Sequence, residues 1–111
     1  MADYYEKKDL ADFPNIGEHS PELAKGFFDY YGAATAKGKL SEREKALIAL
    51  GVALTQNCPY CIDAYTTKCL SIGITAEEMT EASHVGAAMM AGITLAHSTQ
   101  MRKIIKAQGK G

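Results

Sequence analysis

The pattern of apolar and polar residues predicts helices and no strands. After a charged first turn, residues 42–56 are apolar almost all round, which is typical of a central buried helix. No window alternates apolar and polar residues between hairpin turns, as a half-buried strand would. We therefore predict helices at about 21–36, 42–56, 58–72 and 76–107, and an all-α fold in the form of a single-domain helical bundle.

Start and stop signals support these helix bounds. Pro21 occupies a first helical position, where its missing N–H costs nothing. The other signals are an N-cap serine, two capping boxes and two terminal glycines: Ser20, Ser41 with Glu44, Thr75 with Glu78, Gly38 and Gly73. The last helix is long, and we expect a break or kink near Gly86 or Gly92. A further short helix is predicted near residues 4–11.

The composition is that of one ordinary globular domain. The chain has 111 residues, of which 47% are hydrophobic and 23% are charged, with a formal net charge of −1. This length suffices for a single hydrophobic core. We expect one domain over residues 1–111, with residues 1–19 as an N-terminal extension and residues 106–111 as a flexible tail.

Charge and hydropathy exclude several classes of partner. A net charge near zero argues against nucleic acids and anionic membranes, whose binders carry an excess of cations. The longest apolar runs are too short to span a bilayer, and the first residues are charged where a signal peptide needs an apolar core. Three cysteines are too few for the disulfide framework of a secreted domain. We therefore expect a cytoplasmic protein with no membrane or nucleic-acid partner.

Small residues are frequent in the last predicted helix, over residues 82–92. Such residues allow two backbones to approach closely, at a helix contact within the chain or between subunits. Methionines lie beside them and act as adaptable apolar fillers. With this much apolar surface on few helices, we expect the chain to self-associate.

The most chemically informative stretch is "NCPYCIDAYTTKC", residues 57–69. With Asn57 as the cap, Cys58 and Pro59 fall in the first turn of a helix and Cys61 lies one turn on. Unpaired N–H groups at a helix N-terminus stabilise a thiolate and lower the pKa of a cysteine there. The spacing of three places both sulfurs on one side, so that a disulfide needs little adjustment. This pattern favours reversible thiol–disulfide chemistry.

Other interpretations of the cysteines compete with redox chemistry. A structural zinc site needs about four ligands, and the histidines are scattered without ligand spacing, although a site shared between subunits stays open. A thioredoxin-like domain would need a strand before the pair. Inert core thiols are the remaining alternative. Cys69 continues the stripe of Cys58 and Cys61, but lies too far along the axis for a disulfide with Cys61, so a buried role is favoured.

These segments resemble a known family. The capping box, the apolar helix, "QNCPYC" and "ITAEEMTEASHVGAAMMAG" are similar, over residues 20–105, to the carboxymuconolactone decarboxylase and AhpD superfamily. The C-x-x-C pair resembles the alkylhydroperoxidase branch of that superfamily. Within the branch, the chain looks most like the peroxidase-like proteins associated with arsenosugar biosynthesis.

The resemblance implies a helical bundle in which a two-helix hairpin carries the motif, and assembly as a homo-oligomer, a trimer or hexamer. It implies that Cys61 attacks a hydroperoxide and that Cys58 resolves the sulfenic acid. It also implies no bound cofactor and an external dithiol as the thiol reductant. The helix-dipole argument instead favours Cys58 as the more acidic thiol, so the two lines of reasoning disagree.

The chain departs from the peroxidase motif at the proton relay. Ala46 stands where the family carries a glutamate, Tyr65 where it carries a histidine, and Tyr60 where a further histidine sometimes lies. Tyr65 follows Cys61 by one turn and can donate a hydrogen bond to a thiolate or a substrate oxygen. His84, in an apolar context on the next helix, is the other candidate for the relay, if that helix packs against the cysteine helix.

Three functions follow as hypotheses. The first is a peroxidase-type enzyme that cycles Cys58 and Cys61 between dithiol and disulfide. The second is a dithiol protein that binds or reduces an arsenic species, because vicinal thiols chelate trivalent arsenic well. The third is a non-catalytic helical assembly protein that keeps the fold without the relay. Lactone decarboxylation fits least, because it would need polar acid and base groups and uses no thiol pair.

Overall fold

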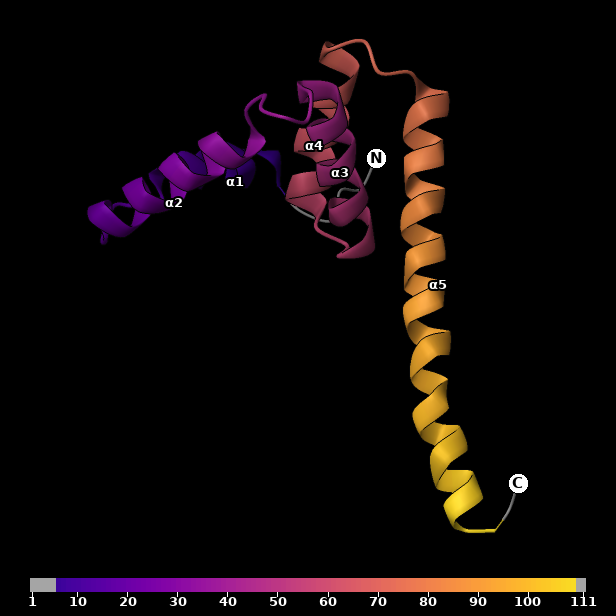
Figure 1. The fold of residues 1–111 in the computed structure, drawn as a ribbon. Coiled ribbons are helices and arrows are strands. Elements are labelled where there is room, and N and C mark those ends of the chain that lie inside the picture. The colour runs from indigo at the N-terminus through magenta and orange to yellow at the C-terminus, as the bar shows by residue number, and fades with distance from the viewer. Residues whose placement is uncertain (1–5, 110–111) are drawn as a thin grey trace.

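The computed structural model describes residues 6–109 and is all-α, as predicted (Figure 1). Its elements are α1 (Lys7–Asp12), the 3-10 helix η1 (Phe13–Asn15), α2 (Pro21–Thr35), α3 (Glu42–Thr55), α4 (Pro59–Ser71) and α5 (Ala76–Ala107). The four main helices begin and end within one residue of their predicted bounds. Residues 4–5 of the predicted first helix and residues 110–111 of the predicted tail lie outside the described residues.

Helix α5 is continuous over 32 residues, so the prediction of a break near Gly86 or Gly92 is wrong. At 1.5 Å per residue the helix is about 48 Å long. Gly86 instead allows α5 to pack closely against α3. A Cβ atom added there would lie 3.0 Å from the Cγ2 atom of Thr55 and 3.7 Å from the carbonyl oxygen of Gly51. The glycine therefore marks the point where α5 crosses α3 closely.

Helix α3 is the centre of the packing, because both α4 and α5 pack against it. Four residues form the buried core between these helices: Ala46, Leu50, Cys69 and Ile74. The sequence predicted that the helix at residues 42–56 is buried on all sides, but α3 is buried on one face only. On the outer face, Ile48 is 56% exposed and Val52 is 57% exposed.

The chain is more open than a closed bundle. Its radius of gyration is 19.0 Å, whereas a compact domain of this length has about 13 Å. Helix α2 and the C-terminal half of α5 project away from α3 and α4 (Figure 1). Most of the residues in these two projecting segments are therefore exposed.

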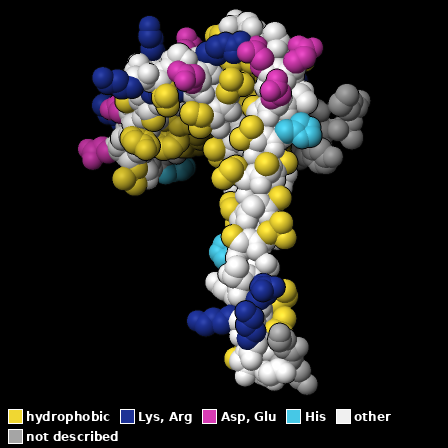
Figure 2. Space-filling model, turned by 45° about the vertical axis from the view of Figure 1, so that its right-hand side comes forward, with side chains coloured by type: hydrophobic (Ala, Val, Ile, Leu, Met, Phe, Trp, Pro, Cys, Tyr) yellow, Lys and Arg dark blue, Asp and Glu magenta, His cyan; other side chains and the backbone are white. Residues whose placement is uncertain are grey.

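The projecting helices carry many exposed apolar side chains. Figure 2 shows them along α5 where it leaves the other helices. On α5 they are Val85, Met89, Met90, Ile93, Leu95, Met101, Ile104 and Ile105, and on α2 they are Leu23, Phe27, Tyr30 and Tyr31. Soluble monomers seldom expose apolar surface over such lengths.

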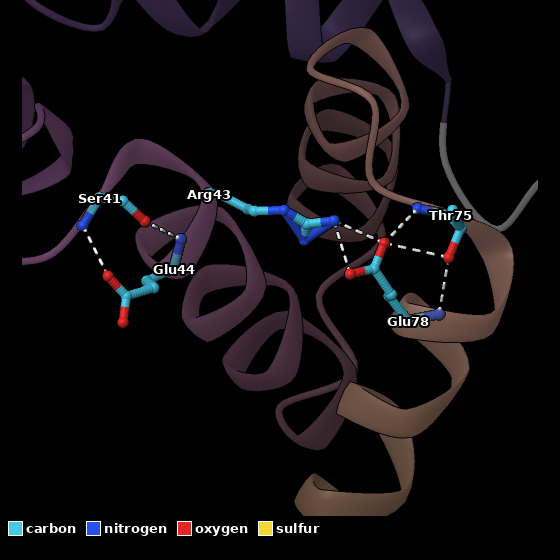
Figure 3. Close-up of polar contacts among 5 residues, drawn as sticks. All are labelled: Ser41, Arg43, Glu44, Thr75 and Glu78. Atoms are coloured by element: carbon cyan, nitrogen blue, oxygen red, sulfur yellow. Dashed lines mark hydrogen bonds and ion pairs between the residues drawn. The ribbon is translucent and has the colours of Figure 1, made fainter.

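Both predicted capping boxes are present, and an arginine links one to a neighbouring helix (Figure 3). The Thr75 hydroxyl accepts the Glu78 N–H at 3.1 Å, and the Glu78 carboxylate accepts the Thr75 N–H at 3.0 Å. Arg43 of α3 donates to the same carboxylate at 2.6 Å. The pKa of Glu78 is held below its ordinary value, first by the Thr75 N–H. One carboxylate thus caps α5 and fixes its start against α3.

The cap of α5 gives a direct test of this arrangement. Thr75→Ala removes the acceptor for the Glu78 N–H, and a lost N-cap costs about 1 kcal/mol of stability. We expect the midpoint of thermal unfolding, followed by far-UV circular dichroism, to fall by roughly 4 °C. Thr80→Ala is the matched control, because the Thr80 hydroxyl only donates back to the Ala76 carbonyl inside the helix. Equal losses in the two variants would contradict a capping role.

Candidate active site

A single turn ends α3 and begins α4. Asn57 adopts a left-handed conformation, with φ of 53°. Its N–H donates to the Leu54 carbonyl at 3.3 Å, and the Cys58 N–H donates to the Ala53 carbonyl at 3.1 Å. These two bonds form a Schellman motif, in which asparagine is one of the few residues that tolerate the left-handed position. The turn therefore fixes Cys58 at the start of α4.

The cap of α4 is Cys58 itself, and the prediction of Asn57 as the cap is wrong. Asn57 is already used as the left-handed residue that terminates α3. The Cys58 sulfur takes the place of a capping oxygen and accepts the Cys61 N–H at 3.4 Å. Pro59 follows at the first helical position, where no N–H is needed. The sulfur thus lies among the unpaired N–H groups of the helix terminus.

The two sulfurs of Cys58 and Cys61 lie 2.9 Å apart, and both thiols are free and half-buried. A disulfide requires about 2.05 Å between its sulfurs. Closing the bond therefore needs a movement of about an ångström and no rearrangement of α4. The third thiol, Cys69, is 0% exposed within the core, as predicted.

The pKa values of the two half-buried thiols move in opposite directions. The pKa of Cys58 is lowered, first by a hydrogen bond from the Cys61 thiol and next by the Cys61 backbone N–H. The pKa of Cys61 is raised to about 11, first by burial and next by its hydrogen bond and charge interaction with Cys58. In the reduced pair, the anion is therefore favoured on Cys58 and the proton on Cys61. This agrees with the helix-dipole argument from the sequence.

Tyr65 lies one turn after Cys61 on α4, and its hydroxyl contacts the hydroxyl of Tyr31 from α2. Burial first, and the Tyr31 hydroxyl next, raise the pKa of Tyr65 above its ordinary value. Tyr65 therefore stays protonated and can serve as a donor. Tyr31 was not predicted, because nothing in its local sequence distinguishes it from the neighbouring Tyr30.

The two thiols open into a pocket of about 370 Å³. Three tyrosines line it beside the sulfurs: Tyr31, Tyr60 and Tyr65. The opposite wall comes from residues 9–16 of the N-terminal extension. The pocket therefore brings together three of the four predicted site residues, Cys58, Cys61 and Tyr65, with a wall from a segment to which the sequence assigned no role.

A second pocket, of about 310 Å³, shares Tyr31, Ala64 and Tyr65 with the first. Ala46, the position of the missing glutamate, lies in its wall, and Lys68 of α4 forms an ion pair there with Glu42 of α3. The tyrosine pair therefore separates the thiol pocket from a polar pocket that contains charged groups.

His84 is not brought to the thiols. It is exposed on α5, which packs against α3, and it lines neither of the two pockets around Tyr65. Within residues 6–109, no three His, Cys, Asp or Glu side chains are grouped so that they could hold a metal ion. None of the described helices is both long and apolar enough to cross a membrane.

Comparisons with known proteins identify the family and the fold of the chain. The chain is 30% identical over 105 residues to "Uncharacterized protein 4 in cox locus" of Paracoccus denitrificans, covering 95% of each chain. It is also similar to the crystal structure of a Methanobacterium thermoautotrophicum protein, with a TM-score of 0.72 and 33% identity over 76% of this chain and 94% of that one. The family model described as "Carboxymuconolactone decarboxylase family" matches residues 21–101. This match spans most of the sequence, and the chain therefore belongs to the carboxymuconolactone decarboxylase family.

Proposed function

We propose that the protein is a thiol–disulfide oxidoreductase of the peroxidase type, which reduces a hydroperoxide with Cys58 and Cys61. The observation that carries the proposal is the placement of two free sulfurs 2.9 Å apart, with opposite pKa shifts, in the wall of a pocket. Thiolate character together with a reachable second thiol is what two-electron redox chemistry requires.

The first step is attack on the peroxide by Cys61, the cysteine adjacent to Tyr65. Cys58, the more acidic thiol, rests as the thiolate and takes the Cys61 proton as the substrate binds. The Cys61 sulfur then bonds to the hydroxyl-bearing oxygen, and the O–O bond breaks. The electron pair leaves on the alkoxide, which accepts a proton from the Tyr65 hydroxyl. The products are an alcohol and a sulfenic acid on Cys61.

The second step closes the disulfide. The Cys58 sulfur attacks the Cys61 sulfenic acid, a bond forms between the sulfurs, and the hydroxyl leaves as water with the Cys58 proton. Tyr65 recovers its proton through Tyr31, which lies between the thiol pocket and the polar pocket. Two electrons from the dithiol have then reduced the hydroperoxide. An external dithiol, as a reducing cytoplasm supplies, returns the pair to its starting state without a bound cofactor.

The cycle is tested by counting free thiols after one equivalent of an organic hydroperoxide. We expect the wild type to lose two thiols and to yield a linked peptide with Cys58 and Cys61. Cys61→Ser should abolish peroxide turnover. Cys58→Ser should form a trappable sulfenic acid on Cys61, but slowly, because the base that deprotonates Cys61 is lost. Cys69→Ala is the matched control and should retain the reaction, because Cys69 is buried away from the pair.

Three other outcomes would contradict the proposal or its assignment of roles. Loss of both thiols to arsenite, with no response to hydroperoxide, would assign the pair to arsenic binding instead. Unchanged thiols with either reagent would favour a non-catalytic assembly protein. A sulfenic acid on Cys58 in the Cys61→Ser variant would reverse the roles of the two cysteines.

The acidity of Cys58 has its own test in the pH dependence of alkylation by iodoacetamide. Because the pKa of Cys58 is lowered, its reaction should reach half its maximal rate at a lower pH than that of an ordinary thiol, near 8.5. Cys61→Ala removes the hydrogen bond that is the first cause of this shift, so the midpoint should move to higher pH. An unchanged midpoint would show that Cys61 does not stabilise the anion. Cys69, being buried, should not react in the native protein.

We also infer that the protein works as a homo-oligomer, a trimer or hexamer. The exposed apolar side chains of α2 and α5, and a radius of gyration far above that of a compact monomer, support this proposal. Among the described residues, a Cβ atom added at Gly92 would meet nothing within 4 Å, so none of them explains the small residue at this position by packing. A second copy laid along α5 would cover the apolar residues and give the glycine a close neighbour.

Light scattering during size-exclusion chromatography tests the assembly. The wild type should show three or six times the 12.0 kDa mass of one chain. Leu95→Glu places a charge on the exposed apolar surface of α5 and should shift the protein toward smaller species. Gln100→Glu adds the same charge at an exposed polar position of the same helix and should leave the mass unchanged. A wild-type monomer would contradict the inference.

A further inference from the structure

We propose that Asp9 and Asp12 exclude ligands that carry a carboxylate from the apolar pocket beside Cys58 and Cys61, so that only uncharged hydroperoxides enter it. The proposal rests on the function proposed above and deepens it by naming the substrate class. It gives the N-terminal extension, to which the sequence assigned no role, the task of substrate selection.

The walls of the pocket are apolar and aromatic. Leu10, Phe13 and Ile16 of the N-terminal extension face Tyr60 and Ala64 of α4 across a volume of about 370 Å³. This volume lies within the range of small-molecule sites. Hydrogen peroxide, not much larger than a water molecule of about 30 Å³, would leave most of it unfilled. A hydroperoxide with an apolar body would instead bury that body against these side chains.

The wall contributed by the N-terminal extension is held by aromatic contacts. The ring of Phe13 packs edge-on against Phe28, at 5.3 Å between centroids, and against Phe27 at 6.0 Å. Phe27 and Phe28 belong to α2, which also carries Tyr31. One helix therefore positions both the apolar wall and the hydroxyl that contacts Tyr65. The wall and the proton donor form parts of one site.

The charged side chains in this pocket wall are acidic. Asp9 and Asp12 line the pocket, and among the described residues no lysine, arginine or histidine lines it. Among residues 6–109, the Asp12 carboxylate accepts a neutral amide donor, from Asn15 at 3.2 Å, and forms no ion pair. Lys8, beside Asp9 in sequence, forms an ion pair with Glu6. With the Cys58 thiolate inside, the pocket presents negative charge to an entering ligand and repels an anion.

The charge selection is measurable without any peroxide chemistry. Iodoacetamide and iodoacetate alkylate the same thiolate, but only iodoacetate is an anion. We expect the ratio of their rates, iodoacetamide over iodoacetate, to fall about threefold for each of Asp9→Asn and Asp12→Asn at low salt, as one surface-near charge is removed. A change in thiol pKa alters both rates alike and cancels in the ratio. Added salt should reduce the difference between wild type and variants.

Glu18→Gln provides the matched control. Glu18 is an exposed acid in the same N-terminal extension, but it does not line this pocket. Its removal should leave the ratio unchanged, which separates local repulsion from the net charge of the protein. A ratio that is unaffected by the Asp9→Asn/Asp12→Asn double variant, or affected equally by Glu18→Gln, would overturn the charge selection.

Turnover then tests the substrate class. We expect the KM for cumene hydroperoxide to be at least tenfold below that for hydrogen peroxide and below that for a ring-carboxylated cumene hydroperoxide. In the Asp9→Asn/Asp12→Asn double variant, the KM for the carboxylated hydroperoxide should move closer to the KM for cumene hydroperoxide. Equal KM values for the three would overturn the proposal. Absence of turnover with all three, together with the expected alkylation ratios, would instead reject the peroxidase function while leaving the anion exclusion established.

Discussion

The site depends on one backbone turn, at residues 56–58, that serves two helices at once. Asn57 accepts the left-handed conformation that lets α3 end, and the same chain reversal places Cys58 at the start of α4. The Cys58 sulfur then satisfies an N–H group that the helix leaves unpaired. The acidity of this thiol, the approach of Cys61 one turn later and the direction of α4 across α3 all follow from that geometry.

In the proposed cycle a pair of tyrosines, Tyr65 of α4 and Tyr31 of α2, stands in for the missing relay. Burial and the hydroxyl of Tyr31 raise the pKa of Tyr65 and hold it in its protonated form, in which it can donate a hydrogen bond. The proposed cycle takes its base from the thiol pair itself, because the pKa of Cys58 is lowered and that of Cys61 is raised. A neutral pair of tyrosines therefore suits a site in which a negative charge is favoured on Cys58.

Features that depend on neighbouring residues were predicted from the sequence, and those that depend on tertiary packing were not. The capping boxes at Ser41 and Thr75 fix helix starts through bonds three residues long, so the bounds were accurate. The contact of Tyr31 with Tyr65 joins residues 34 apart and depends on how α2 is oriented, which no periodicity encodes. The same reason explains why the sequence did not reveal that His84 lies away from the thiols. Its position is set by the packing of α5 on α3. A break or kink was predicted near Gly86 because the residue that packs against it, Thr55, is distant in sequence and cannot be identified from the local pattern.

The topology also bears on how the chain folds. Within residues 6–109, α4 and α5 make their principal packing against α3, whereas α2 makes few contacts with it. Both α2 and α4 adjoin α3 in the chain, and α5 follows after one short hairpin. Such low contact order is characteristic of fast-folding helical proteins, since little loop entropy is lost before native contacts form. The hairpin of α3 and α4 is complete at Ser71, so the segment that sets the two sulfurs in register is contiguous in the chain and does not include the 32 residues of α5.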